Sequence, residues 1–129
     1  MKSQRFGIEI EMTGLTRRSA ALIIAKHFDT GFRHERGIYD TYSVCDQDGR
    51  KWKIVRDASI TPQCGNRFDY DPDYKVEVVS PICHYEDIET IQSIVRELRR
   101  NGHAKVNESC GIHIHVDASK HTARSLRNI

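Results

Sequence analysis

Long apolar runs and internal repeats are absent from this chain of 129 residues. No stretch approaches the roughly 18 consecutive apolar residues that a transmembrane helix needs, so we expect no membrane span. The N-terminal residues MKSQRFGIEIEM become acidic where a secretory signal would need a continuous apolar segment. We therefore expect a cytoplasmic protein.

Closely spaced cysteine pairs are also absent. The four cysteines, Cys45, Cys64, Cys83 and Cys110, contain no CxxC spacing. Without an export signal, reduced thiols are a better expectation than disulfides. A zinc site that joins Cys64, Cys83, Cys110 and a histidine stays open as an alternative on residue type, although its spacings are irregular.

The chain also lacks a large excess of positive or negative residues. The chain has 20 Lys and Arg against 18 Asp and Glu, for a formal net charge of +2. This balance gives no indication of nucleic acid or membrane as a partner. With 38% hydrophobic residues and this length, residues 1–129 are expected to form a single domain with one modest core.

Periodicity in the sequence predicts alternating strands and helices. Two helices are expected, one at residues 17–28 behind a Thr16 cap and one at residues 85–102, where Gly102 is expected to cap the end. Residues 29–41 and 61–73 are polar, contain glycine or proline, and are interpreted as loops.

Five segments have the composition or alternation of strands, and Asp48-Gly49 between two of them is typical of a hairpin. They are residues 5–12, 41–47, 50–57, 74–81 and 110–117. A further helix is expected to begin at Ser119. The order β-α-ββ-β-α-β-α predicts an α+β fold.

Side chains two residues apart on a strand point to the same face. Glu9 therefore points with Glu11, and His113 with His115, while Glu77 lies opposite the core-facing Val76 and Val78. If the strands share one sheet, these acidic residues and histidines line a single polar face. The buried face is expected to include five apolar partners, Ile8, Ile10, Ile112, Ile114 and Val116.

Paired carboxylates with imidazoles suit Mg²⁺ or Mn²⁺ in a site that also binds phosphate. The alternative is that each pair lies on a solvated sheet face. Asp57 and Ser59 directly follow a predicted strand, where they either position a substrate or form a turn through local hydrogen bonds.

Four segments in this order resemble the amidoligase family, the carboxylate-amine ligases similar to glutamine synthetase and glutamate-cysteine ligase. They are FGIEIEM, WKIVRDASI, KVEVVSPI and SCGIHIHVD, which together span residues 6–117. Each motif is weak alone, but the ordered combination is much more specific.

The resemblance implies a glutamine-synthetase-like catalytic domain, in which a curved, mainly antiparallel sheet is backed by helices. It implies ATP and Mg²⁺ (or Mn²⁺) as cofactors. The implied reaction phosphorylates a carboxylate, after which an amine displaces phosphate to form an amide or peptide-like bond. Small-molecule or peptide carboxylates and amines are then the expected partners, and the oligomeric state, including a homo-oligomer, stays open.

The same resemblance implies roles for single residues. The implied metal ligands are Glu9, Glu11, Glu77 and His113. His115 would lie near the ATP phosphates, and Glu9 would also contact the cofactor. Glu77, Asp57 and Ser59 would act on the substrate. Ala58 stands where the family usually has glycine in its DGS motif.

Length is a second departure, because members of the family are usually about twice as long. We therefore expect this chain to be an N-terminal half, with a non-catalytic nucleotide- or metal-binding remnant as one alternative. The other is a metal-dependent hydrolase that uses HxH, although Ala118 follows Asp117 where the metallo-β-lactamase pattern has a histidine.

Overall fold

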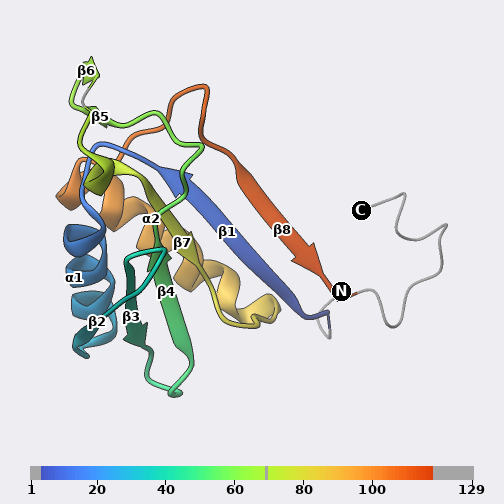
Figure 1. Cartoon of the computed structure of the whole chain (residues 1–129). Coiled ribbons are helices and arrows are strands. Elements are labelled where there is room, and N and C mark those ends of the chain that lie inside the picture. The colour runs from blue at the N-terminus through green and yellow to red at the C-terminus, as the bar shows by residue number, and fades with distance from the viewer. Residues whose placement is uncertain (1–3, 69, 118–129) are drawn as a thin grey trace, which may run out of the picture.

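The computed structural model describes residues 4–68 and 70–117, which form a sheet layer and a helix layer (Figure 1). In chain order the elements are β1 (Phe6–Met12), α1 (Arg17–Phe28), β2 (Phe32–Arg36), β3 (Thr41–Cys45), β4 (Lys51–Val55), β5 (Gln63–Cys64), β6 (Arg67–Phe68), the 3₁₀ turn η1 (Pro72–Tyr74), β7 (Val76–Val79), the 3₁₀ turn η2 (Tyr85–Asp87), α2 (Ile88–Gly102) and β8 (Ile112–Val116). The predicted α+β class is confirmed.

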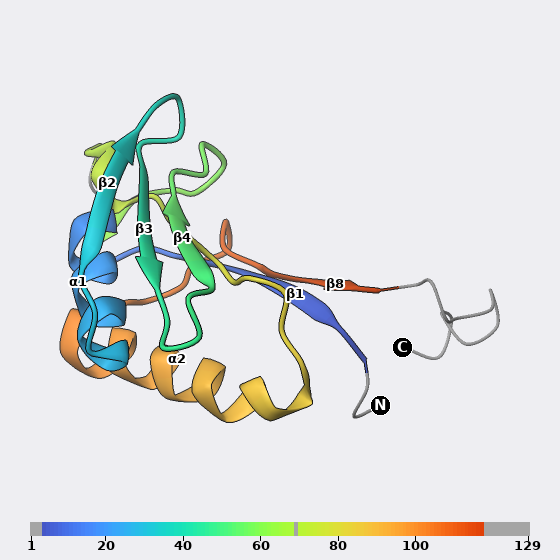
Figure 2. The same ribbon diagram turned by 90° about the horizontal axis from the view of Figure 1, so that it is seen from below.

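The main sheet has six strands in the order β2-β3-β4-β7-β1-β8 among the described residues. Every neighbouring pair is antiparallel. The first strand of the chain therefore lies between β7 and β8, which come from much later in the sequence. In Figure 2, β2, β3 and β4 run steeply across the direction of β1 and β8, and both helices lie on one side of the sheet. The right-handed twist between neighbouring strands accounts for this change in direction.

Helix α1 begins where the sequence predicts, whereas α2 begins at Ile88, after the 3₁₀ turn η2. The Thr16 side chain accepts a hydrogen bond from the Ser19 backbone N–H at 3.1 Å and caps α1. The buried side of α1 consists of small and apolar residues, including Ala21, Ile24 and Phe28. Because alanines occupy so much of this side, α1 can lie close to the strands.

The core lies between the helices and the sheet. Trp52 and Ile54 of β4 point toward the helices together with Val76 and Val78 of β7, and all four are almost fully buried. The indole N–H of Trp52 donates to Asp46 at 3.1 Å, so its polar atom is satisfied inside the core. The predicted hairpin between β3 and β4 is confirmed, with Gly49 at φ 79° in its turn.

Arg17 fixes the segment that leads into β7. Its side chain is almost fully buried, and its guanidinium donates to the carbonyl oxygens of Pro72 at 2.7 Å and Lys75 at 3.0 Å. The same group binds the Asp40 carboxylate at 2.6 Å and holds the pKa of that carboxyl below its usual value. Helix α1 thereby sets the position at which β7 begins.

Two predicted loops contain regular structure. The prediction of a loop over residues 29–41 is wrong in part, because Phe32–Arg36 form β2. This edge strand is mostly exposed and polar, so it lacks the alternation that identifies a half-buried strand. The predicted loop over 61–73 contains the short pair β5 and β6 and the start of η1.

The end of α2 also differs from the prediction. Gly102 is the last helical residue, and His103 at φ 62° adopts the left-handed conformation that ends the helix. A Cβ at Gly102 would lie 2.7 Å from the Ile23 side chain and 2.9 Å from the Leu15 side chain. The glycine therefore permits close packing of α2 rather than the turn that follows it.

The prediction of buried apolar residues in β8 is wrong for Ile112 and Ile114, whereas Val116 is partly buried. Ile112 is 62% exposed and Ile114 is 61% exposed, because β8 is the edge strand and α2 borders its apolar side without covering it. Ile8 and Ile10 of β1 are partly buried against the core. The helix predicted after Ser119 lies outside the described residues.

Candidate metal centre

One face of the sheet is not covered by α1 or α2, and we call it the open face (Figure 2). Glu9 is the Cα partner of His113, and Glu11 is the Cα partner of Glu77. Residues that are paired across strands project to the same side. The predicted acidic residues and histidines, His115 included, therefore share the open face, as expected.

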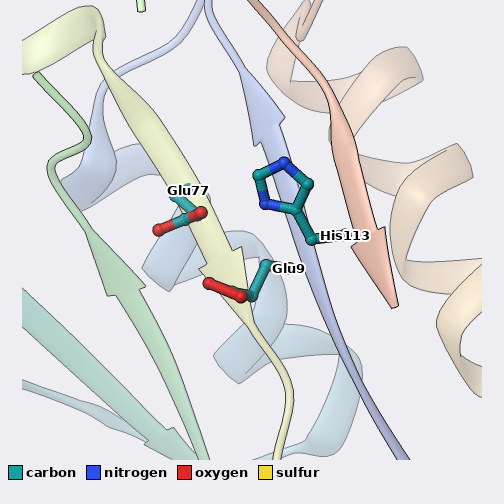
Figure 3. Close-up of side chains that lie close together, drawn as sticks. All are labelled: Glu9, Glu77 and His113. Atoms are coloured by element: carbon teal, nitrogen blue, oxygen red, sulfur yellow. The ribbon is translucent and has the colours of Figure 1, made fainter. Parts of the chain in front are cut away.

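Glu9, Glu77 and His113 form a first group of potential ligands. Each offers one atom, and these atoms lie within 4.8 Å of one another. Figure 3 shows the three side chains close together on one side of the ribbon, from β1, β7 and β8. Two carboxylates and one imidazole at this spacing are a suitable partial ligand set for a divalent cation.

Glu11, Asp57 and Glu77 form a second group with the same spacing limit of 4.8 Å. Asp57 follows the end of β4, on the other side of β7 from β1. Glu77 belongs to both groups because β7 lies between β4 and β1 in the sheet. The two groups therefore form one continuous acidic centre with Glu77 in its middle.

The central position of Glu77 changes its protonation. Burial, together with repulsion from Glu9, Asp57 and Glu11, raises the pKa of Glu77 to about 7. Only 9% of this residue is exposed. A cation beside Glu77 would relieve both causes, since it compensates the negative charge that burial and neighbouring carboxylates disfavour.

The carboxyl groups of Glu11 and Asp57 shift each other's pKa in opposite directions. The hydrogen bond between the two carboxyl groups raises the pKa of Glu11 and lowers the pKa of Asp57. Glu11 is almost fully buried, which adds to the rise in its pKa. Asp57 therefore loses its proton at a lower pH than Glu11 does.

A backbone amide that the sequence motifs did not identify orients Glu11. The N–H of Gly111 donates to Glu11 Oε1 at 2.7 Å. A Cβ at position 111 would lie 3.2 Å from that oxygen, so glycine allows this close approach. The glycine of the SCGIHIHVD segment was the available signal, because glycine next to a strand often marks a close backbone contact.

The loop before β8 is held in place by Asn107. Its side-chain amide donates to the Thr61 carbonyl at 2.9 Å and to the Gln63 side chain. Its carbonyl oxygen accepts from the Ser109 N–H at 3.0 Å. This network links the loop that ends at Gly111 to the segment after Asp57.

His115 contacts the first group without belonging to it. Its Nε2 is hydrogen-bonded to Glu9 Oε1, and its side chain is 68% exposed. The imidazole can therefore orient Glu9 while its ring stays accessible from the open face. The structure thus places His115 beside Glu9, one of the predicted metal ligands.

Asp57 and Ser59 form the local turn that was one of the two interpretations of the sequence, and Asp57 is also a potential metal ligand, which the sequence motifs did not predict. Asp57 Oδ1 accepts hydrogen bonds from the Ser59 N–H at 2.9 Å and the Ser59 hydroxyl at 2.7 Å, as in an Asx turn. Asp57 also belongs to the second ligand group. Ser59 is exposed and lies next to the acidic centre through Asp57.

Other sequence candidates do not join the centre. Neither ligand group contains a cysteine among the described residues, and the four cysteines there are free thiols. Asp117, which completes the HxHxD string, forms an ion pair with Arg5 at 2.6 Å. The zinc alternative and the hydrolase alternative therefore gain no support from this geometry.

Within the described residues, no helix is long and apolar enough to cross a membrane. No curated protein and no solved structure matches the chain significantly. A family model described as "Putative amidoligase enzyme" matches residues 2–129, which is almost the whole chain. The chain therefore belongs to the amidoligase family.

Proposed function

We propose that this chain is a catalytic domain of an ATP- and Mg²⁺-dependent carboxylate-amine ligase with a glutamine-synthetase-like fold. The observation that carries the proposal is the pair of ligand groups that share Glu77 on the open face. Family membership supports the ligase class.

The composition of the two groups supports magnesium or manganese over zinc. All five residues of the two groups carry a carboxylate or an imidazole, and thiolates are absent from both groups in the described part of the chain. Mg²⁺ prefers oxygen ligands in octahedral geometry and usually keeps several water molecules. Three protein ligands for each ion would leave positions for water and phosphate oxygens.

The proposed division of roles follows the two groups. Glu9, Glu77 and His113 would hold one cation, and Glu11, Asp57 and Glu77 would hold the other. His115 would orient Glu9 and reach toward the phosphates. Bound magnesium would neutralise the charge on ATP and on the leaving phosphate, which is the main requirement of phosphoryl transfer.

The substrate would be bound from the open face. ATP would transfer its γ-phosphoryl group to a carboxylate, and an amine would then displace phosphate to form the amide bond. Asp57, with Ser59 bound to its carboxylate, lies at the margin of the centre, where we expect contact with the substrate. The carboxylate and the amine would be small molecules or peptide groups.

Metal and nucleotide binding test the proposal directly. Titration calorimetry with Mn²⁺ should give two bound ions for each chain, and MgATP should raise the melting temperature. Glu77→Gln should remove most of the Mn²⁺ binding, since this residue is shared by both groups. Release of phosphate from ATP should then depend on a carboxylate together with an amine.

Glu35→Gln is the matched control. Glu35 is an edge-strand carboxylate that is bound to Lys51 at 2.7 Å and belongs to neither group. Its replacement should leave Mn²⁺ binding unchanged. A wild-type chain that binds neither Mn²⁺ nor MgATP would contradict the proposal.

A further inference from the structure

We infer that Lys53, with Arg33 beyond it, binds a second anionic group of the ligand whose first anionic group lies at the acidic centre. This inference rests on the proposed function, because it takes the acidic centre as the metal site. Beyond the proposed function, it specifies that the bound ligand extends from the acidic centre across the strands of the open face toward Lys53.

The strand register aligns six residues in a single row across the sheet. Arg33 pairs with Ser43, Ser43 with Lys53, and Lys53 with Val79. Val79 pairs with Glu9, and Glu9 pairs with His113. We call this set the cross-strand row, and in strand order it consists of Arg33, Ser43, Lys53, Val79, Glu9 and His113.

The cross-strand row has metal-ligand side chains at one end and positively charged side chains toward the other. Glu9 and His113 belong to the first ligand group, whereas Lys53 and Arg33 carry positive charge toward the β2 edge. Since Glu9 is on the open face and paired residues project to the same side, the whole row lies on that face. Val79 stands between the two charged parts and carries no charge of its own.

The spacing suits a ligand with two anionic groups. Neighbouring strands lie about 4.8 Å apart, so the backbones of Lys53 and Glu9, two strands apart, are separated by about 10 Å. A lysine side chain is a flexible four-carbon stem with a compact charge at its end. The Lys53 ammonium can therefore reach over Val79 toward a group bound at the acidic centre.

Lys53 has no ion pair among the described residues, unlike its neighbour on the same strand. Lys51 binds Glu35 at 2.7 Å, whereas Lys53 acts on Glu35 only through longer-range attraction. Lys53 is also exposed on the strand that precedes Asp57. Its charge is thus available to an incoming ligand without first breaking a contact within these residues.

The chemistry that fits this position is an oxyanion, either a phosphate or a carboxylate. A lysine ammonium donates charge-assisted hydrogen bonds to both. In the proposed reaction the anion belongs to the phosphate chain of ATP or to a carboxylate of the substrate that does not react. The two sources share one chemistry at Lys53 and can be distinguished by which ligand loses affinity when Lys53 is replaced.

The experiment uses the full chain saturated with Mn²⁺. Titration calorimetry measures binding of ATP, inorganic tripolyphosphate and L-glutamate to the wild type, Lys53→Gln and Lys53→Arg. We expect Lys53→Gln to lower the binding affinity for at least one of these anions by about tenfold, which corresponds to the loss of one charge-assisted hydrogen bond. Mn²⁺ affinity should stay unchanged, and Lys53→Arg should restore most of the lost affinity.

Lys26→Gln is the control for the loss of one positive charge, because Lys26 is exposed on α1, away from the cross-strand row. It should bind every anion as the wild type does. Loss of ATP and tripolyphosphate binding in Lys53→Gln identifies the phosphate chain, and loss of glutamate binding identifies a carboxylate.

Two results would overturn the inference while leaving the metal site intact. One is equal anion affinity of Lys53→Gln and the wild type with normal Mn²⁺ binding. The other is a Mn²⁺-loaded wild type that binds none of the three anions. Failure of the wild type to bind Mn²⁺ would instead remove the proposed function itself, and the inference with it.

Discussion

Glu77 is the residue on which the acidic centre depends. It is the only member common to the two ligand groups among the described residues, and the buried strand β7 supplies it. Burial and three neighbouring carboxylates make its ionisation unfavourable. A carboxylate whose charged form is unfavourable without a cation, and would be stabilised by one, is typical of a functional rather than a structural site.

Replacing Glu77 with glutamine should stabilise the metal-free protein at neutral and higher pH. The folded pKa of about 7 lies above the reference value of 4.5, so the folded state holds a proton that the unfolded state releases between these values. Wild-type stability should therefore fall as pH rises through this range, and Glu77→Gln should lack this loss. We expect a gain of about 2–3 kcal/mol at pH 8 and little difference at pH 4.5.

Urea denaturation with a metal chelator, at several pH values, measures this difference. Glu35→Gln is a suitable control, because Lys51 lowers the pKa of Glu35 instead of raising it. A constant difference between Glu77→Gln and the wild type across the whole pH range would show that Glu77 is not held protonated in the folded protein.

At the scale of elements, β7 is the strand that organises the centre. It pairs with β4 on one side and β1 on the other, so it lies between the strands that lead to Asp57 and carry Glu9 and Glu11. Its entry is fixed by Arg17, which binds the carbonyls of Pro72 and Lys75. Arg17 of α1 therefore fixes the position at which β7, the strand that carries Glu77, begins.

Arg17→Met should destabilise the fold by about 3 kcal/mol, because it removes the hydrogen bonds that the buried guanidinium donates to the carbonyl oxygens of Pro72 and Lys75 and to the Asp40 carboxylate. Arg17 depresses the pKa of Asp40, so its stabilising effect should be present at neutral pH and decrease as pH falls below about 4. Urea denaturation at pH 7 and pH 3 measures both effects.

Arg96→Met provides the comparison for this change. Arg96 is exposed on α2, and its replacement should alter the free energy of unfolding by less than about 0.5 kcal/mol. Equal effects of the two substitutions would mean that the contacts of Arg17 do not contribute to stability.

At the scale of the molecule, the two sides of the β1–β8 end of the sheet have opposite character. The open face carries the acidic centre. The other side has an apolar groove of about 430 Å³ between β8 and the start of α2, with Phe6, Ile8, Ile88 and Ile114 among its lining residues.

Ile114→Ser should test the exposure of this groove. Because Ile114 is 61% exposed, its replacement should change the free energy of unfolding by less than about 1 kcal/mol. It should also reduce the binding of an apolar fluorescent dye such as ANS. Ile54→Ser, on the same sheet but fully buried, should cost at least about 3 kcal/mol. Similar costs for the two changes would mean that Ile114 is buried in the folded protein.

Much of the local structure was predictable, because local structure follows local pattern. The strands at Ile8 to Glu11 and at Glu77, the helix capped by Thr16 and the hairpin at Gly49 all appear where the sequence indicates. The strand Phe32–Arg36 was not predictable from alternation, because both of its faces are polar and its partner is β3. The burial of Ile114 was predicted wrongly, since periodicity does not identify an edge strand.

The sequence by itself determined which side chains share a face on each strand, because the period of two leaves no other arrangement for Glu9 with Glu11 or His113 with His115. Only the tertiary structure decided which strands are neighbours, because strand order depends on contacts between residues far apart in the chain. By placing β7 between β4 and β1, it made Glu77 common to both ligand groups and aligned Lys53 with Glu9. The backbone of Gly111 became a partner of Glu11 for the same reason, since only folding brings residues 100 positions apart into contact.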